Sequence, residues 1–214
     1  IAKRLRFDEV NEPHISNYIK DVLKDKSEEE LVDLFNNDSN TAQTFKQKID
    51  SLVAEYQHDN FKKLLDQGLI ICEPTYNLPA KITLSKKAQG LSKGLYLEED
   101  GNINNFEYDV IAAVANLDNV LFWHRNQERG NGFCINGFIN HYPDFIIRTK
   151  SGITVLLETK GDDRDNSDSR QKIDLGKSWA NKSGDKYRYF MVFNNTEVDG
   201  AYTKAEFLDI LKAL

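Results

Sequence analysis

The sequence predicts an α/β fold preceded by a small α-helical segment. Up to about residue 80, apolar residues recur every three or four positions, as on one face of a helix. Beyond that point, short runs rich in β-branched and aromatic residues alternate with helical patterns, as in a sheet covered by helices. Between the two parts, residues 73–79 contain two prolines and interrupt the helical pattern. We therefore expect a helical segment at 1–80 and an α/β domain at 81–214.

Three helices are expected in the first part. The first covers 15–23, where apolar residues form a single stripe. The second begins at Ser27, a preferred N-cap residue, and continues with three glutamates whose charge suits a helix N-terminus. This helix should bury Phe35. The third covers 41–67 and should end at Gly68, because glycine readily adopts the backbone conformation that closes a helix.

The second part should place helices and strands around one sheet. Helical spacing of apolar positions predicts the helices, and aromatic or β-branched runs predict the strands. The expected elements are a helix at 104–117, strands at 120–124, 142–148 and 153–160, a helix at 169–182, a strand at 187–193 and a closing helix at 203–214. Three glycines between 130 and 141 predict a loop or an irregular hairpin there.

Composition and charge exclude several classes of protein. The 214 residues are 40% hydrophobic, as in a globular protein, and lack the apolar run of about 18–20 residues that a membrane span needs. With 28 Lys and Arg against 34 Asp and Glu, the net charge is −6, which at first sight argues against nucleic-acid binding. The charge is uneven, however: residues 1–80 carry 10 against 15 (−5), and residues 81–214 carry 18 against 19 (−1). Some acids of the second part could therefore be metal ligands.

The cysteines and the first residue bear on location and on completeness. Cys72 and Cys134 cannot build a disulfide framework and lack the paired spacing of a zinc site, so a reducing cytoplasm is expected. The chain begins at Ile1 rather than at a methionine, which leads us to expect part of a larger protein.

A predicted hairpin places charged residues on one side of the sheet. Gly152 suits the last position of a three-residue loop, so that Thr149 and Ile153 would form the flanking pair. In that register Asp144 lies directly across from Glu158. Because strand side chains alternate between faces, Lys160 shares the face of Glu158. Two facing carboxylates repel each other, and a bound divalent cation would remove that conflict.

The same face has the residue types that phosphodiester hydrolysis requires. Mg²⁺ prefers oxygen ligands and often combines one or two carboxylates with a substrate phosphate. A nearby lysine ammonium can orient a water molecule or neutralise charge on a phosphate. A surface hairpin with scattered charges is the alternative. The apolar residues on the opposite face argue for strands of a buried sheet. They are Phe145, Ile147, Val155 and Leu157.

At these residues the sequence resembles a known superfamily. Pro143-Asp144, followed after thirteen residues by Glu158-Thr159-Lys160, is similar to the PD-(D/E)XK nuclease motif. Residues 99–107, Trp123-His124-Arg125-Asn126 and the stretch around the motif resemble the C-terminal endonuclease domain of the Res subunit of type III restriction enzymes. The resemblance covers about residues 95–214. It implies a restriction-endonuclease-like core with a mixed sheet and the order αβββαβ.

Carried over to this sequence, the resemblance implies a metal site and a catalytic lysine. Asp144 and Glu158 would bind Mg²⁺, which Mn²⁺ could replace, and Lys160 would be the catalytic residue. Glu107 matches the extra carboxylate that many members take from the first core helix. A solvated helix residue is the alternative at that position.

Four further residues are weaker candidates for contacts with DNA or its phosphates. Gln171 and Lys172 match a motif that some members place near the phosphate. His124 ends a predicted strand near the expected site, although a single histidine is more often structural. Arg125 follows it and could contact a phosphate, with a solvated loop as the alternative.

The implied activity is that of a Mg²⁺-dependent DNA endonuclease domain of a type III restriction enzyme. DNA and the modification (methyltransferase) subunit would be its partners. ATP would be bound only by a motor outside this chain, because Gly176-Lys177-Ser178 lacks the glycine of a P-loop five residues earlier, where Gln171 stands. The alternatives are another PD-(D/E)XK nuclease, from type I restriction or repair, and a non-catalytic docking module of a helicase.

Overall fold

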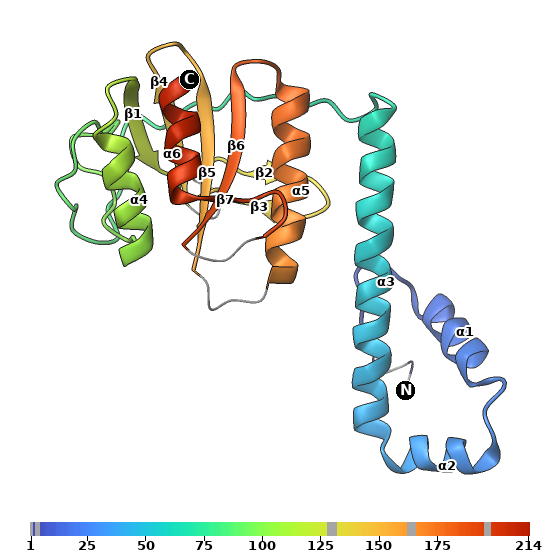
Figure 1. The fold of residues 1–214 in the computed structure, drawn as a ribbon. Coiled ribbons are helices and arrows are strands. Elements are labelled where there is room, and N and C mark those ends of the chain that lie inside the picture. Colours follow the sequence, from blue (N-terminus) through green and yellow to red (C-terminus); the bar gives the residue numbers. More distant parts are fainter. Residues whose placement is uncertain (1, 3–4, 128–131, 162–165, 195–197) are drawn as a thin grey trace. The chain divides into compact units, whose positions relative to one another are not determined.

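The protein is described from a computed structural model of residues 1–214, which describes all residues except 1, 3–4, 128–131, 162–165 and 195–197 (Figure 1). The chain divides into two compact units, Ile1–Leu69 and Ile70–Leu214. The second unit thus includes residues 70–80, which the sequence pattern grouped with the helical segment. No described helix combines the length and the apolar character that crossing a membrane requires.

The first unit is built from three helices, α1 (Glu12–Leu23), α2 (Glu28–Asn36) and α3 (Asp38–Asp66). The predicted cap at Ser27 is confirmed, since its side chain and that of Glu30 cap each other's backbone N–H groups. Gly68 follows α3 with a φ of +70°, as expected. Phe35 was expected to be buried but is 67% exposed. Helical periodicity identifies the apolar side of α2, but it does not determine how much of that side a neighbour covers.

The second unit has a five-stranded mixed sheet in the order β1-β4-β5-β6-β7 (Figure 1). Antiparallel pairing joins β1 to β4 and β4 to β5, and parallel pairing joins β5 to β6 and β6 to β7. The strands are β1 (Val120–Arg125), β4 (Phe145–Thr149), β5 (Thr154–Lys160), β6 (Tyr187–Phe193) and β7 (Tyr202–Thr203). Within the predicted irregular hairpin, β2 (Ile135–Asn136) pairs with β3 (Asn140–His141).

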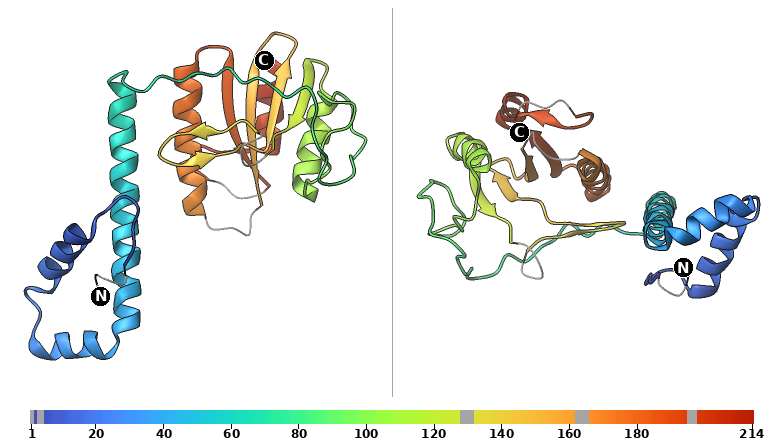
Figure 2. Two further views of the ribbon diagram at one scale, coloured as in Figure 1. Left: turned by 180° about the vertical axis from the view of Figure 1, so that it is seen from behind. Right: turned by 90° about the horizontal axis from the view of Figure 1, so that it is seen from below.

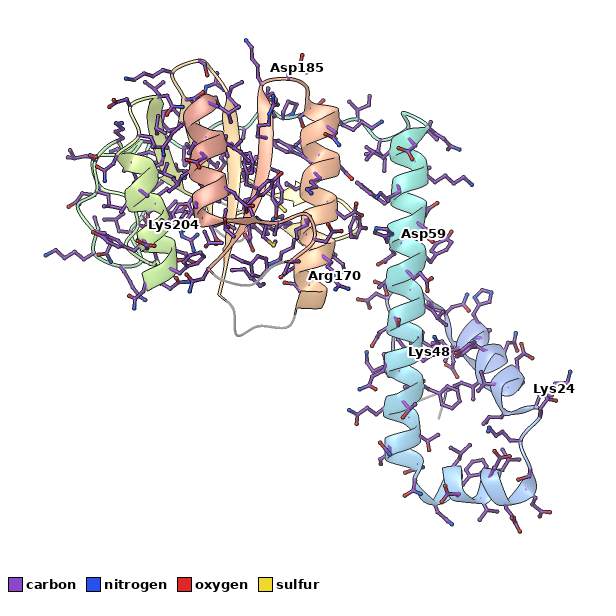
Figure 3. All side chains as sticks on the ribbon, viewed as in Figure 1. Lys24, Lys48, Asp59, Arg170, Asp185 and Lys204 are labelled. Atoms are coloured by element: carbon purple, nitrogen blue, oxygen red, sulfur yellow. The ribbon has the colours of Figure 1, made fainter. Side chains whose placement is uncertain are left out.

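Helices cover both faces of this sheet (Figure 2). One face packs against α4 (Asn105–Ala115) and α6 (Lys204–Ala213), and α5 (Asn166–Ser183) lies on the other. Lys204, labelled in Figure 3, pairs with Asp109 and so links α6 to α4. The apolar face predicted from alternation is confirmed. Its core residues are Phe145, Ile147, Val155 and Leu157 from the hairpin, with Val110, Ile111, Val114, Phe207 and Leu211 from the helices.

The β4–β5 hairpin has the predicted register. Phe145 pairs with Leu157 and Ile147 with Val155, and the N–H of Thr149 donates to the carbonyl of Ile153 at 2.9 Å. Gly152 has a φ of +87°, a conformation that favours glycine in this turn. The register therefore brings Asp144 and Glu158 to the same end of the hairpin.

A second glycine is explained by helix packing rather than by phosphate binding. Gly176 lies in the middle of α5, where a Cβ atom would come within 2.5 Å of the Tyr189 ring on β6. The Gly-Lys-Ser sequence thus lies within a helix, at a site of close helix–sheet contact.

Candidate active site

The charged residues of the hairpin gather at one edge of the sheet, where β1 and β5 end and β4 begins. Asp144 immediately precedes β4, Glu158 and Lys160 lie in the last residues of β5, and Arg125 is the last residue of β1. Antiparallel pairing of β4 with both neighbours brings these chain ends together. Strand topology thus collects residues that are far apart in the sequence.

Asp144 is held by two neighbours, one on each carboxylate oxygen. Its Oδ1 accepts from Nη1 of Arg125 at 2.9 Å, and its Oδ2 accepts from the backbone N–H and the hydroxyl of Thr159 at 2.7 and 2.8 Å. Burial alone would lower the pKa of Arg125, but Asp144, Glu107 and Glu158 raise it above its ordinary value. Arg125 therefore remains charged. The role of Thr159 was missed, because the motif leaves this position unspecified.

Glu158 is a buried carboxylate with one unused oxygen. Glu158 is 5% exposed, and its Oε1 lies 3.2 Å from Nζ of Lys172. Oε2 is buried and has no hydrogen-bond partner among the described residues. Burial and then the charge of Asp144 raise the pKa of Glu158 from 4.5 to about 8, against the opposing effect of Lys172 and Lys160. This carboxyl group is accordingly short of positive partners.

Lys160 and Lys172 meet at a shared carboxylate. Oδ2 of Asp168 lies 3.3 Å from Nζ of Lys160 and 3.2 Å from Nζ of Lys172. The sequence pattern predicts a helix that starts at residue 169, but Asp168 already lies in the first turn of α5. Its four-residue spacing from Lys172 is the signal that could have identified it. Residues 162–165, between β5 and α5, lie outside the described part of the chain.

Glu107 lies beside this cluster on the other side of Arg125. Its Oε1 is 4.0 Å from Nη2 of Arg125, while Oε2 accepts from the backbone N–H of Asn104 at 2.8 Å. The residue is buried, at 9% exposure, and belongs to the capping box that begins α4. The alternative of a solvated helix residue is therefore wrong. Arg125 connects Glu107 to Asp144.

The weaker candidates divide into two groups. Arg125 and Lys172 belong to the site through Asp144 and Glu158, respectively. His124 is only 2% exposed, and its Nδ1 lies 2.9 Å from Oε2 of Glu99. The same Glu99 oxygen accepts from the N–H of Arg125 at 3.1 Å, so the His124–Glu99 pair supports the end of β1. Gln171 is exposed on α5.

A buried histidine–tyrosine pair interacts electrostatically with the same charged residues. Nε2 of His141 lies 2.9 Å from the hydroxyl of Tyr189, and Nδ1 has no partner among the described residues. Burial, followed by the charge of Lys172, lowers the pKa of His141 from 6.5 to about 3. The imidazole is therefore neutral at pH 7. His141 lies in β3, which is only two residues long and carries no periodic pattern that would predict its burial.

The donor set fits a small divalent cation that takes part of its coordination from water or substrate. Asp144 and Glu158 offer oxygen only, as Mg²⁺ prefers, and Oε2 of Glu158 needs a partner. Among the described residues, Oδ1 of Asp144 accepts a side-chain hydrogen bond from Arg125 alone, so it retains a second lone pair, whereas Oδ2 already accepts two hydrogen bonds from Thr159. In the part of the chain that the structure describes, no group of three or more His, Cys, Asp or Glu side chains is placed to hold a metal. Two carboxylates would leave most coordination positions of such an ion to other ligands.

Comparison with known proteins identifies no relative: no family model, no curated protein and no solved structure matches the chain.

Proposed function

We propose that the second unit is a Mg²⁺-dependent DNA endonuclease domain with a restriction-endonuclease-like core, of the kind that Res subunits of type III restriction enzymes carry. The observation that supports this most strongly is the buried Glu158 beside Asp144, with Lys160 two residues further on. One oxygen of Glu158 has no hydrogen-bond partner among the described residues. A buried carboxylate oxygen without a hydrogen-bond partner is costly, and a metal site is a physical reason to keep it.

In this proposal, Asp144 and Glu158 hold Mg²⁺ or Mn²⁺ together with a DNA phosphate. The ion, when bound, lowers the pKa of a water molecule and neutralises charge on the phosphate. Arg125 and Thr159 fix the orientation of Asp144 through its two oxygens. Lys160 orients the attacking water. Glu107 acts indirectly, through Arg125, because the guanidinium of Arg125 interacts with both Glu107 and Asp144.

The proposal assigns recognition and energy supply to other proteins or domains. DNA is the substrate, and the modification subunit would recognise the target sequence. ATP would serve a motor elsewhere in the assembly, which would operate in the cytoplasm. Cleavage that needs ATP and two head-to-head sites would distinguish the type III class from other PD-(D/E)XK nucleases in type I restriction or repair.

The test combines cleavage with metal binding on the purified chain. Relaxation of supercoiled plasmid should require Mg²⁺ or Mn²⁺ and should be lost in Asp144→Ala and Lys160→Ala, with circular dichroism unchanged. Asp118→Ala and Lys186→Ala are matched controls, because both residues are exposed and lie outside the site. Mg²⁺ should also raise the melting temperature of the wild type but not of Asp144→Ala. Undiminished cleavage by Asp144→Ala, or a melting temperature indifferent to both metals, would overturn the proposal.

One observation favours a non-catalytic docking module as the second candidate. Both oxygens of Asp144 already have protein partners, so the site is partly closed by its own residues. A metal-indifferent melting temperature together with absent cleavage would favour this module.

A further inference from the structure

A polar cavity lies directly beside the candidate active site. It has a volume of about 490 Å³, within the range of roughly 300–1,000 Å³ that ligand sites occupy. Residues 79–85 form one wall, and the segments around Asn102 and Gln127 form the others. The wall at 79–85 lies outside the part of the sequence that resembles nucleases, so the resemblance does not account for this cavity.

Some residues that line the cavity already form hydrogen bonds that stabilise the fold. Asp100 accepts hydrogen bonds from the backbone N–H groups of Ser85, Lys86 and Asn102. Burial alone would raise the pKa of Asp100, but these bonds lower it below its ordinary value. The side-chain amide of Asn126 likewise forms hydrogen bonds with backbone groups of Phe133 and Pro143. These residues shape the cavity and are not available to a ligand.

Other lining groups are free to bind. The side chains of Lys81, Thr83 and Asn102 are exposed and form no hydrogen bond with another described residue. Gln127 uses its Nε2 on the carbonyl of Thr83 at 3.2 Å, which leaves its carbonyl oxygen as an acceptor. One ammonium, a hydroxyl and two amide groups therefore line a single cavity. This combination suits a phosphate together with the polar edge of a base.

Arg125 connects the cavity to the carboxylates. It lines the cavity and forms the 2.9 Å ion pair with Asp144. A DNA strand with a phosphate at Asp144 and Glu158 would thus place an adjoining nucleotide within reach of the cavity.

We propose that this cavity binds one nucleotide of the DNA strand next to the cleaved phosphate, with Lys81 contacting its phosphate and Asn102 and Gln127 its base or sugar. The proposal rests on the nuclease function proposed above and adds a binding site to it. Loss of Lys81 should remove one phosphate contact, and loss of Asn102 should remove a neutral hydrogen bond.

The test measures binding of the full chain to a short fluorescein-labelled DNA duplex by anisotropy in EDTA, so that no cleavage occurs. Lys81→Ala should weaken binding and reduce the slope of log affinity against log salt by about one. Asn102→Ala should weaken binding with the slope unchanged, because no charge is lost. Lys87→Ala is the matched control, since Lys87 is exposed on the same segment but does not line the cavity. Its affinity and slope should equal those of the wild type.

The outcomes separate this site from the catalytic proposal. If Lys81→Ala and Asn102→Ala bind DNA as the wild type does, the cavity assignment is wrong, whatever Asp144→Ala does to cleavage. If both variants lose affinity while the wild type cleaves nothing with any metal, the cavity assignment holds and the nuclease assignment falls. Melting temperatures equal to that of the wild type would show that the variants are folded.

Discussion

Arg125 and Asp144 form an ion pair in which Nη1 lies 2.9 Å from Oδ1, and the same Nη1 donates to the backbone carbonyl of Asp144 at 2.9 Å. These bonds tie the end of β1 to the start of β4. With Glu107 only 4.0 Å from Nη2, one guanidinium faces two carboxylates. In the metal-free protein, the charge balance of the site thus depends on Arg125.

Arg125→Met should lower the free energy of unfolding by about 3 kcal/mol, because it leaves largely buried carboxylates without their cation. The rise in melting temperature on adding Mg²⁺ should be larger than in the wild type, since the ion would relieve more repulsion. Denaturant titration in EDTA and thermal melts with and without Mg²⁺ measure both effects. Arg188→Met is the control, because Nη1 of Arg188 donates to backbone carbonyls of Asp185 and Tyr187. A Mg²⁺ response no larger than that of the wild type would contradict this account.

Glu158 should make the stability of the metal-free protein depend on pH. Its pKa is raised from 4.5 to about 8, so the folded protein retains a proton that the unfolded chain releases within that window. The free energy of unfolding therefore falls as pH rises from 4.5 to 8.

Glu158→Gln removes this titration and should gain stability relative to the wild type as pH rises. One pKa unit corresponds to about 1.4 kcal/mol, so the gain between pH 5 and pH 9 should reach several kcal/mol. Denaturant titrations in EDTA at the two pH values measure it. Glu98→Gln, at an exposed position, should differ from the wild type in free energy of unfolding by the same amount at both pH values. A constant difference for Glu158→Gln would mean that the carboxyl group is ionised throughout.

Gly176→Ala tests the packing of α5 on the sheet. Alanine has a higher helix propensity than glycine, by about 0.8–1.0 kcal/mol. Its Cβ, however, would lie 2.5 Å from the ring of Tyr189. Overpacking should dominate and destabilise the protein by about 1–3 kcal/mol. Asn181→Ala, at an exposed position of the same helix, should be neutral or slightly stabilising. Chemical denaturation compares the two, and Tyr189→Leu should reduce the penalty at Gly176.

The sequence was sufficient to predict the hairpin because its register depends on local features. The positive φ of Gly152 and the alternation of apolar residues fix the register, so the convergence of Asp144 and Glu158 follows. The ion pair of Lys172 with Glu158 could not be predicted in the same way. Spacing determines the helix face of a long side chain, but not which carboxylate its flexible end reaches.

The segment before α4 was the least predictable part. Residues 70–104 contain no long periodic pattern, and their course depends on hydrogen bonds between distant residues, such as those from Ser85 to Asp100. The prolines predicted a boundary near residue 80, whereas the two units divide between Leu69 and Ile70. The sequence pattern gave no sign of the cavity.

Lys172 offers a test of the charge state of Glu158 through a double-mutant cycle. The cycle combines Lys172→Met with Glu158→Gln and measures the coupling between the two groups in EDTA. At pH 9 Glu158 is largely ionised, and the coupling should be on the order of 1–2 kcal/mol. At pH 6 it is protonated, so the ion pair is lost and the coupling should fall to that between the Lys172 ammonium and an uncharged carboxyl group. The matched cycle pairs Lys172→Met with Asp168→Asn. Burial alone would raise the pKa of Asp168, but Lys172 and Lys160 lower it below its ordinary value. That carboxylate is therefore ionised at both pH values, and its coupling to Lys172 should not change. Two cycles with the same pH dependence would show that the titrating group is not Glu158.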